Sequence, residues 1–292
     1  MSDKVLNVIV TYNRLNDLKV CVENIKAQTY KNLDILVVNN GSTDGTTEYL
    51  AEQTGIKVIS QGNLGGAGGF YAGMKYMIDN SYDWLWMMDD DGIPDTKQLE
   101  MLLAFNKKTG YAFLNALVID KDDHNKLAFG PLTGHRYVYV DEVTGNEDFD
   151  VIIHPFNGTF IKREIIEKIG LIKKECFIWG DEQEYTLRAK RGGYFPHTVT
   201  TAIHYHPTEK GRKGRVFPGF SHKNVLVKPK QLSHYFYRNQ GYIDHTYNNY
   251  HNIFTKFIIR NSVYFIRTVQ FEELSKLFKY YIRGWHNNYK NS

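Results

Sequence analysis

The stretch Trp84-Leu85-Trp86-Met87-Met88-Asp89-Asp90-Asp91, WLWMMDDD in one-letter code, decides the fold class of this chain. Its first part is an unbroken apolar run, which is typical of a strand that is buried on both faces of a sheet. Its second part places three carboxylates side by side, and such groups repel each other unless a cation or hydrogen-bond donors neutralise them. We therefore predict a buried strand over Trp84–Met88 that runs directly into a polar site.

Strand and helix signals alternate on the N-terminal side of this stretch. Val5–Thr11 is a β-branched run, which predicts a first buried strand, and Leu15–Gln28 follows it with apolar residues close to helical spacing. The alternation continues with strands at Asp34–Asn39 and Lys57–Ser60 and with helices at Thr46–Gln53 and Phe70–Asn80. This pattern predicts an α/β fold in which a mostly parallel sheet has flanking helices on both faces.

Polar and glycine-rich loops follow the predicted strands. They read TYNR at 11–14, NNGSTDG at 39–45, QGNLGGAGG at 61–69 and DDDG at 89–92. In mostly parallel sheets, ligands bind in the crevice outside the carboxyl ends of the strands. We therefore expect these loops to converge on one ligand site.

The pattern becomes mixed beyond the aspartates. Strands are predicted near Tyr111–Ile119 and Phe156–Lys162, and helices at Arg163–Ile169 and Gln183–Arg191. Residues 231–285 look helical and are rich in aromatic and basic side chains. We therefore predict an α/β domain over 1–230 and a C-terminal helical extension over 231–292.

The overall composition argues against several classes of protein. The chain has 292 residues, of which 42% are hydrophobic and 23% charged, with a formal net charge of +4 and two cysteines. These values are ordinary for a globular protein, and they favour neither a nucleic-acid partner nor a disulfide framework. No apolar stretch approaches the length that spans a bilayer, and no secretory signal precedes the first predicted strand, so we expect a cytoplasmic protein.

The aspartates are candidate metal ligands. Mg²⁺ and Mn²⁺ prefer oxygen ligands and commonly share them with substrate phosphates. Asp89 and Asp91 are two residues apart, so both can point to one side of an extended segment. His204 and His206 are candidate nitrogen ligands, which Mn²⁺ accepts more readily than Mg²⁺. The alternative interpretations are an acidic turn that caps a helix starting near Pro94, and two structural histidines.

Short polar side chains at the first two strand ends are candidate nucleotide contacts. Thr11, Asn13 and Asn39 can hydrogen-bond a base or a ribose, and Arg14 can offset phosphate charge. The same residue types cap helices, so capping is the alternative. The glycines of Asn63–Phe70 permit close backbone approach, and the N-terminus of the helix predicted after them favours an anion. The first strand-to-helix turn contains no glycine, which argues against a dinucleotide-binding enzyme.

Acidic residues begin a later predicted helix, in the segment WGDEQEY at 179–185. A carboxylate there is suited to deprotonate an acceptor hydroxyl while a metal stabilises a departing diphosphate. By position we favour Glu182 as this base, with Asp181 close behind and Glu184 third. The alternative is that these acids lie in a first helical turn because the helix dipole favours them there. Trp179 precedes these acids, and a core side chain is one interpretation of it.

The motifs VIVTYNR, VVNNGSTDGT, NLGGAGGF, WLWMMDDDGIP, FNGTFI and FIWGDEQEYTLR together resemble those of family 2 glycosyltransferases, over about residues 5–240. Within that family the chain looks most like bacterial galactofuranosyl- and rhamnosyltransferases of cell-surface polysaccharide synthesis. The resemblance implies a GT-A fold, a UDP- or dTDP-linked sugar donor and inversion at the anomeric carbon.

The resemblance also assigns roles to individual positions. Asp89 and Asp91 match the metal-binding acidic motif, and the pair His204 and His206 matches a late histidine ligand. The WGDEQEY segment matches the region that supplies the general base. The residues expected to bind the nucleotide and the donor sugar are Thr11, Asn13, Arg14, Asn39, Asn63, Gly65, Gly66, Asp89, Asp90 and Trp179.

The glycine-rich loop NLGGAGGF looks more like that of galactofuranosyltransferases than that of other members. UDP-galactofuranose is therefore the favoured donor, with dTDP-rhamnose as the alternative and Mn²⁺ or Mg²⁺ as the cofactor. A different class of alternative is a nucleotide-sugar-binding protein without turnover. The expected acceptor is a glycan or a polyprenyl-linked glycan at the inner face of the membrane. For the C-terminal extension, membrane contact, oligomerisation and packing on the catalytic domain all remain open.

Overall fold

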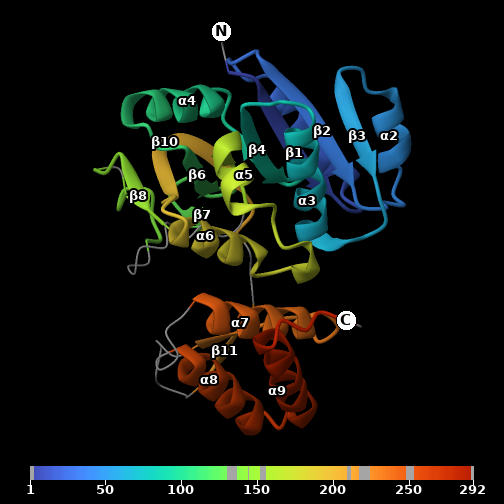
Figure 1. The fold of residues 1–292 in the computed structure, drawn as a ribbon, viewed down its shortest axis with the longest axis vertical. Coiled ribbons are helices and arrows are strands. Elements are labelled where there is room, and N and C mark those ends of the chain that lie inside the picture. Colours follow the sequence, from blue (N-terminus) through green and yellow to red (C-terminus); the bar gives the residue numbers. More distant parts are fainter. Residues whose placement is uncertain are drawn as a thin grey trace. The chain divides into compact units, whose positions relative to one another are not determined.

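The computed structural model describes residues 3–129, 137–143, 145–151, 156–208, 212–216, 224–247 and 253–290. The chain forms two compact units (Figure 1). The first consists of Met1–Lys174 and Tyr185–Thr208, and the second of Glu175–Glu184 and Glu209–Ser292. None of the helices in the described ranges is both long enough and apolar enough to cross a lipid bilayer.

The first unit contains the predicted alternation of strands and helices. Its strands are β1 Val5–Thr11, β2 Leu33–Asn39, β3 Ile56–Ser60, β4 Trp84–Asp89, β5 Ile93–Pro94, β6 Phe113–Asp120, β7 Leu127–Phe129, β8 Asp148–Asp150, β9 Thr159–Lys162 and β10 His197–His206. Its helices are α1 Leu15–Lys26, α2 Thr46–Glu52, α3 Gly65–Asp79, α4 Gln98–Thr109 and α5 Arg163–Ile169, together with most of α6 Asp181–Arg191.

The main sheet is mostly parallel, which confirms the predicted fold class. Its strand order is β3-β2-β1-β4-β9-β6-β10-β5. β1 pairs in parallel with β2 and with β4, and β6 pairs in parallel with β10. β9 is the exception in the middle of the sheet, because it runs antiparallel to both β4 and β6.

Both faces of this sheet are buried. Successive side chains of a strand point to opposite faces, so Leu6 and Val8 of β1 pack in a cluster with residues of α3 and α5. Val5 and Ile9 of the same strand pack in a second cluster, with residues of α1 and α4. Because helices cover both faces of the sheet, its strands consist of near-continuous runs of apolar residues.

The carboxyl ends of the first strands meet at one edge of the sheet. Thr11 of β1 is level with Asn39 of β2, and Asn39 is level with Ser60 of β3. On the other side of β1, Val10 is level with Asp89 of β4. The polar loops that follow these strands therefore begin side by side, as the strand-end rule predicts.

Helix α3 begins at Gly65, which corrects the prediction of a glycine-rich loop followed by a helix from Phe70. Most of these glycines lie inside the helix because α3 packs closely on β1. A Cβ atom on Gly69 would lie 2.4 Å from Val10 Cγ1, and one on Gly73 would lie 2.4 Å from Val8 Cγ1. Glycine has a low helix propensity, but here it allows the helix to lie in close contact with the sheet.

The helix expected near Pro94 begins later, at Gln98. Ile93 and Pro94 form the short strand β5 instead, antiparallel to β10 at the end of the strand order. Proline is compatible with this place because an edge strand leaves one row of backbone groups without ladder bonds.

The second unit is largely helical, as predicted for its C-terminal part. It contains the antiparallel pair β11 Arg212–Arg215 and β12 Asn224–Val227, and the helices α7 Ser233–Tyr247, α8 Ile253–Arg267 and α9 Phe271–Trp285. Its core joins Tyr237 of α7, Phe265 of α8 and Leu277 of α9. Residues Glu175–Glu184, which precede and begin α6, belong to this unit as well.

Candidate functional site

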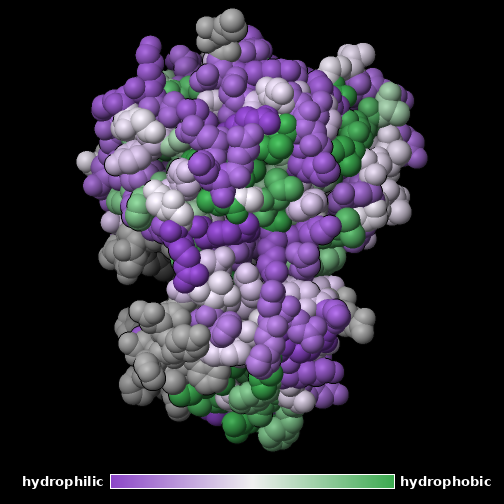
Figure 2. All heavy atoms as spheres, in the orientation of Figure 1, coloured by the Kyte–Doolittle hydropathy of each residue, from purple (hydrophilic) through white to green (hydrophobic). Residues whose placement is uncertain are grey.

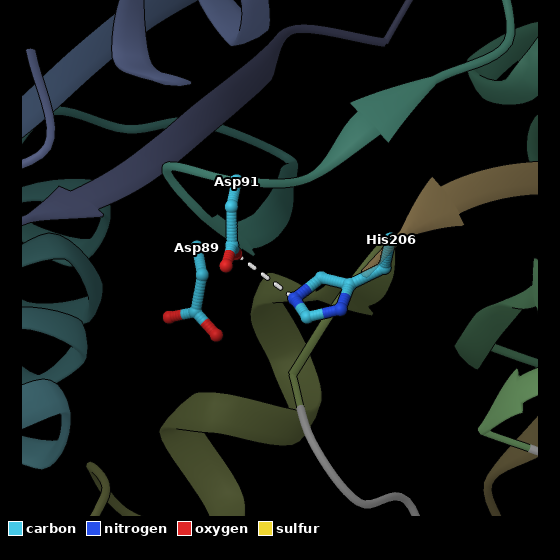
Figure 3. Close-up of side chains that lie close together, drawn as sticks. All are labelled: Asp89, Asp91 and His206. Carbon is cyan, nitrogen blue, oxygen red and sulfur yellow. Dashed lines mark ion pairs between the residues drawn. The ribbon is translucent and has the colours of Figure 1, made fainter. Parts of the chain in front are cut away.

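Asp89, Asp91 and His206 offer ligand atoms that all lie within 4.8 Å of one another. Figure 3 shows the three side chains pointing toward one another, with His206 Nε2 2.9 Å from Asp91 Oδ1. Two carboxylates and one imidazole at this separation suit a divalent cation that accepts oxygen and nitrogen ligands, such as Mn²⁺. The donor set therefore fits the expected metal.

Strand pairing brings this group together from distant parts of the sequence. Asp89 is the last residue of β4, and Asp91 lies in the turn between β4 and β5. Because β5 pairs with β10 and Ile93 is level with Tyr205, the end of β10 lies beside that turn. His206, the last residue of β10, is thereby placed next to Asp91.

Cationic neighbours keep Asp91 ionised. Burial by itself would raise the pKa of Asp91, but the hydrogen bond and charge of His206, together with Arg14, lower this pKa to about 2. Burial also opposes the protonation of His206, yet the contact with Asp91 raises the pKa of the imidazole. Arg14 Nη1 forms an ion pair with Asp91 Oδ2, and Arg14 Nε lies 4.0 Å from Asp90 Oδ1. The arginine that we expected to face phosphate therefore contacts the aspartates.

Asp90 differs from its two neighbours. It is 4% exposed, and burial raises the pKa of its carboxyl to about 7. A middle carboxyl group that is more easily protonated reduces the repulsion among three adjacent acids. Asp89 and Asp91 are thus the pair that the structure presents to a cation.

His204 lies outside this group. Its side chain is fully buried, its Nδ1 accepts a hydrogen bond from the Gln98 side-chain amide at 3.0 Å, and burial lowers the pKa of its imidazole to about 3. A Cβ atom on Gly92 would lie 2.4 Å from His204 Nε2, so the ring packs directly beneath the turn that follows the aspartates. Of the two predicted histidine ligands, the structure brings only His206 to the carboxylates.

Asn157 lies at the candidate site, although no sequence motif predicted it there. Its side chain is fully buried, its Oδ1 accepts a hydrogen bond from the backbone N–H of Asp89 at 3.2 Å, and its Nδ2 donates to Asp89 Oδ2 at 3.4 Å. Gly158, which follows it, has φ +74°, and a Cβ atom there would lie 2.8 Å from Ala116 Cβ. The motif FNGTFI therefore carries an amide that orients the first aspartate.

The loops after β1 and β2 are hydrogen-bonded to each other. The backbone N–H of Asn13 donates to Ser42 Oγ at 3.0 Å, and the N–H of Thr43 donates to Asn13 Oδ1 at 2.7 Å. Asp44 Oδ2 accepts a hydrogen bond from the N–H of Leu15 at 2.9 Å and so caps α1 from the neighbouring loop. Asn13 thus joins the two loops and makes no side-chain cap at the start of α1.

The remaining predicted nucleotide residues lie at the ends of β1, β2 and β3. Thr11 and Asn39 are 1% and 2% exposed. The Asn39 amide accepts a hydrogen bond from Ser42 N–H in the following loop at 2.9 Å and donates one to Thr47 Oγ1 of α2 at 3.0 Å. Asn63 Oδ1 accepts a hydrogen bond from the N–H of Gly65 at 2.9 Å. Gly66 lies in the first turn of α3, and a Cβ atom there would have open space around it. The predicted nucleotide residues therefore lie at or just after the ends of neighbouring strands, and Gly66 is the one with open space beside its Cα.

The acids at the start of α6 have different surroundings. Asp181 is 3% exposed, and Glu184 is 1% exposed and accepts a hydrogen bond from the Tyr247 hydroxyl at 2.6 Å. Glu182 is partly exposed as a residue, but its Oε2 is buried and accepts no hydrogen bond from any described residue. Trp179 is partly exposed, with Lys228 Nζ 4.2 Å from its ring centroid. Glu182 thus has a buried carboxylate oxygen that makes no hydrogen bond within the described part of the chain.

Comparison with known proteins identifies relatives over most of the chain. The family model described as Glycosyl transferase family 2 matches residues 7–170. The galactofuranosyltransferase GlfT1 of Mycobacterium tuberculosis is 31% identical over 252 residues, which cover 83% of each chain. The dTDP-rhamnosyl transferase RfbF of Shigella flexneri is 24% identical over 207 residues, which cover 68% of this chain and 67% of RfbF.

Solved structures share the fold. The mannosyltransferase PcManGT from Pyrobaculum calidifontis, solved in complex with GDP-Man and Mn²⁺, superposes with a TM-score of 0.55 at 14% sequence identity. The match covers 96% of this chain and 74% of that one. This likeness confirms the predicted GT-A fold.

Proposed function

The chain belongs to glycosyltransferase family 2, and from this premise we propose that it transfers galactofuranose from UDP-galactofuranose to a glycan or polyprenyl-linked glycan, with inversion at the anomeric carbon. The observation that carries the proposal is the group formed by Asp89, Asp91 and His206 at the carboxyl ends of a mostly parallel sheet. This is where α/β folds of this kind bind their ligands.

Asp89, Asp91 and His206 would hold a divalent cation, with Asn157 orienting Asp89. When bound, the cation would neutralise the negative charge that develops on the leaving diphosphate. Arg14 adds a positive charge next to the same carboxylates. The loops after β1 and β2, which are hydrogen-bonded to each other, would bind the uridine.

Glu182 would act as the general base, with Asp181 as the alternative. The acceptor hydroxyl oxygen attacks the anomeric carbon from the face opposite the nucleotide and gives its proton to the carboxylate, while the bond from the anomeric carbon to the diphosphate oxygen breaks. UDP leaves and the configuration inverts. Support for Glu182 comes from its uncommitted Oε2, whereas Glu184 is buried against Tyr247.

We expect kcat/KM for UDP-galactofuranose to exceed that for dTDP-rhamnose by at least about 100-fold, because a site that hydrogen-bonds sugar hydroxyls rejects an analogue that lacks them. The likeness to GlfT1, which is higher in identity and coverage than the likeness to RfbF, supports this choice. The measurement is the release of UDP or dTDP in the presence of Mn²⁺ and an acceptor extract. Faster release of dTDP would overturn the galactofuranose assignment in favour of the rhamnose alternative.

Catalysis is favoured over nucleotide-sugar binding without turnover. A protein that only binds its ligand has no use for a general base, yet Glu182, the proposed base, is present together with Asp89 and Asp91, the proposed metal ligands. Release of free nucleotide in excess of the protein concentration distinguishes the two, because a binding protein releases none.

An acceptor on a polyprenyl chain would place the enzyme at an anionic membrane surface on the cytoplasmic side, and we propose that α8 and α9 contact that surface. Apolar side chains gather over these helices at the lower end of the second unit (Figure 2). The exposed large apolar residues of α8, of α9 and of the turn between them are Ile259, Ile266, Val269, Phe271, Phe278 and Ile282. Exposed cations on the same helices are Lys256, Arg260, Arg267 and Lys279. Basic side chains beside apolar ones are the combination that binds anionic lipid.

Replacing Phe271 and Phe278 with serine should weaken binding to phosphatidylglycerol-containing vesicles by more than about tenfold. Each phenyl ring removed from the membrane interface reduces the binding free energy by about 1.5–3 kcal/mol. Co-sedimentation with vesicles measures this loss. Phe195→Ser is the matched control, since Phe195 is 50% exposed but lies in the first unit. Wild-type protein that stays in the supernatant and forms dimers would contradict membrane contact and favour oligomerisation.

A further inference from the structure

The segment Glu175–Gly180, directly before α6, has an unusual backbone. Phe177 and Trp179 have φ values of 65° and 60°, and Gly180 has a φ value of 99°. Large side chains rarely adopt this left-handed conformation. It persists only where the surrounding structure imposes it, and such places cluster at functional sites. The conformation of this segment sets where α6 begins and hence how its acids are presented.

Asn239 of α7 binds the backbone of this segment. Its side chain is 1% exposed, and its Nδ2 lies within hydrogen-bonding distance of three carbonyl oxygens, those of Cys176 at 2.9 Å, Ile178 at 3.1 Å and Trp179 at 2.8 Å. A Cβ atom on Gly180 would lie 3.3 Å from Asn239 Cβ. The left-handed backbone of this segment therefore directs three carbonyl oxygens toward the one side-chain amide of Asn239.

Arg238, the preceding residue, holds the start of the segment. Its side chain is fully buried, and its Nη2 donates to the carbonyl oxygen of Glu175 at 2.7 Å. The guanidinium lies 5.1 Å and 4.2 Å from the ring centroids of Tyr235 and Tyr289. Its Nη1 has no hydrogen-bond partner in the described part of the chain. A well-packed apolar side chain would often stabilise such a core at least as well as a buried cation, so stability alone does not explain this arginine.

Helix α9 fixes α7 in place. A Cβ atom on Gly284 would lie 1.7 Å from the carbonyl oxygen of Arg238, and one on Gly241 would lie 2.1 Å from that of Tyr281. The two helices are therefore in direct backbone contact at the level of Arg238. The Tyr281 hydroxyl also donates to Asp244 Oδ2 of α7 at 2.8 Å. Arg238 and Asn239 thus project from a tightly packed helix pair.

We infer that Arg238 and Asn239 are positioning residues for the transfer reaction: they hold Glu175–Gly180 in its left-handed conformation and so present the general base at the start of α6. The inference rests on the proposed base, Glu182 or Asp181. It gives the C-terminal helices a part in catalysis that is separate from contact with a membrane.

The test begins with Asn239→Asp, which keeps the size of the side chain but removes the amide donor and turns a carboxylate toward three carbonyl oxygens. A misplaced catalytic group can slow a reaction by about 10²-fold, so kcat should fall by that factor. The KM for UDP-galactofuranose and the affinity for Mn²⁺ should stay unchanged. Gln240→Met is the matched control. It also removes an amide from α7, but the Gln240 amide donates to Asp244 Oδ1 of the same helix at 2.7 Å and not to Glu175–Gly180, so kcat should stay unchanged.

Coupling to the base separates a positioning role from a general structural one. If Asn239 acts through Glu182, the double variant Asn239→Asp with Glu182→Gln will be no slower than Glu182→Gln alone. The effects of substitutions at residues that act as a unit are not additive. The same comparison is made with Asp181→Asn. Losses that multiply in both double variants would overturn the positioning role.

Failure of the proposed base gives a different pattern. Wild-type kcat in both Glu182→Gln and Asp181→Asn would overturn the base assignment and the positioning role with it. Wild-type kcat in Asn239→Asp, with a base variant impaired, would overturn the positioning role alone. Should Asn239→Asp lose Mn²⁺-dependent UDP binding, which marks a misfolded protein, Asn239→Ser replaces it under the same criteria.

Discussion

An Asp91→Asn variant is expected to lose about 10³-fold in kcat/KM for the nucleotide sugar, since a metal ion contributes several kcal/mol of charge stabilisation in the transition state and each 1.4 kcal/mol is worth tenfold. Asparagine keeps the shape of Asp91 but removes the charge that faces His206 and Arg14. The rate of UDP release at saturating Mn²⁺ measures the loss, and the electron paramagnetic resonance of bound Mn²⁺ measures metal affinity.

The control is Asp120→Asn, which removes a carboxylate from a neighbouring strand end. Asp120 ends β6 and is level with His206, yet it does not belong to the group that presents ligand atoms to a cation. It should keep nearly the wild-type rate. Equal Mn²⁺ affinity in wild type and Asp91→Asn would show that the aspartates are an acidic turn and not a metal site.

A Glu182→Gln variant is expected to lose about 10³-fold in kcat, within the range typical of a general base. Glutamine cannot take the proton of the acceptor hydroxyl, but it leaves the metal group unaltered. Binding of UDP and Mn²⁺ should therefore remain as in wild type. Turnover with a saturating acceptor measures the first effect, and calorimetry measures the second.

Glu184→Gln is the matched control on the same helix turn. Glu184 is buried and accepts the Tyr247 hydroxyl, a hydrogen bond that glutamine can also accept, so this variant should retain its rate. If Asp181→Asn loses the rate while Glu182→Gln keeps it, Asp181 is the base. If none of the variants Asp181→Asn, Glu182→Gln and Glu184→Gln is impaired, the base does not lie in this segment.

Sequence patterns alone predicted the fold class and the strand end that carries the aspartates. The apolar run before Asp89 leaves few alternatives to a buried strand. Mostly parallel sheets bind their ligands outside the carboxyl ends of their strands, which is where the aspartates follow this run. The glycines of α3 were misread because helix-on-sheet contact and approach to a ligand both require a missing Cβ atom. Only the structure shows Val8 and Val10 beside Gly73 and Gly69.

The choice between His204 and His206 could not be predicted because it depends on strand pairing. Two histidines at i and i+2 share a face of a strand, and only the pairing of β5 with β10 decides which one meets the aspartates. Asn157 was missed for a related reason. It lies 68 residues from Asp89 in sequence, and a single amide in a loop has no pattern of its own.

The association of Glu175–Glu184 with the C-terminal helices also depends on long-range contacts. Nothing in the composition of FIWGDE marks it as separate from the α/β domain, and the predicted boundary at residue 230 followed the aromatic and basic content instead. The hydrogen bonds from Arg238 and Asn239 join positions about sixty residues apart. Local sequence patterns do not predict such long-range contacts.

A calorimetric titration of the wild-type protein with UDP-galactofuranose, with and without Mn²⁺, tests whether this protein binds a nucleotide sugar through a metal ion. If Asp89, Asp91 and His206 hold a cation that binds the diphosphate, saturable binding will appear with Mn²⁺ and be greatly weakened after chelation. Equal affinity in both conditions, or no binding of any UDP or dTDP sugar in either, would contradict the account.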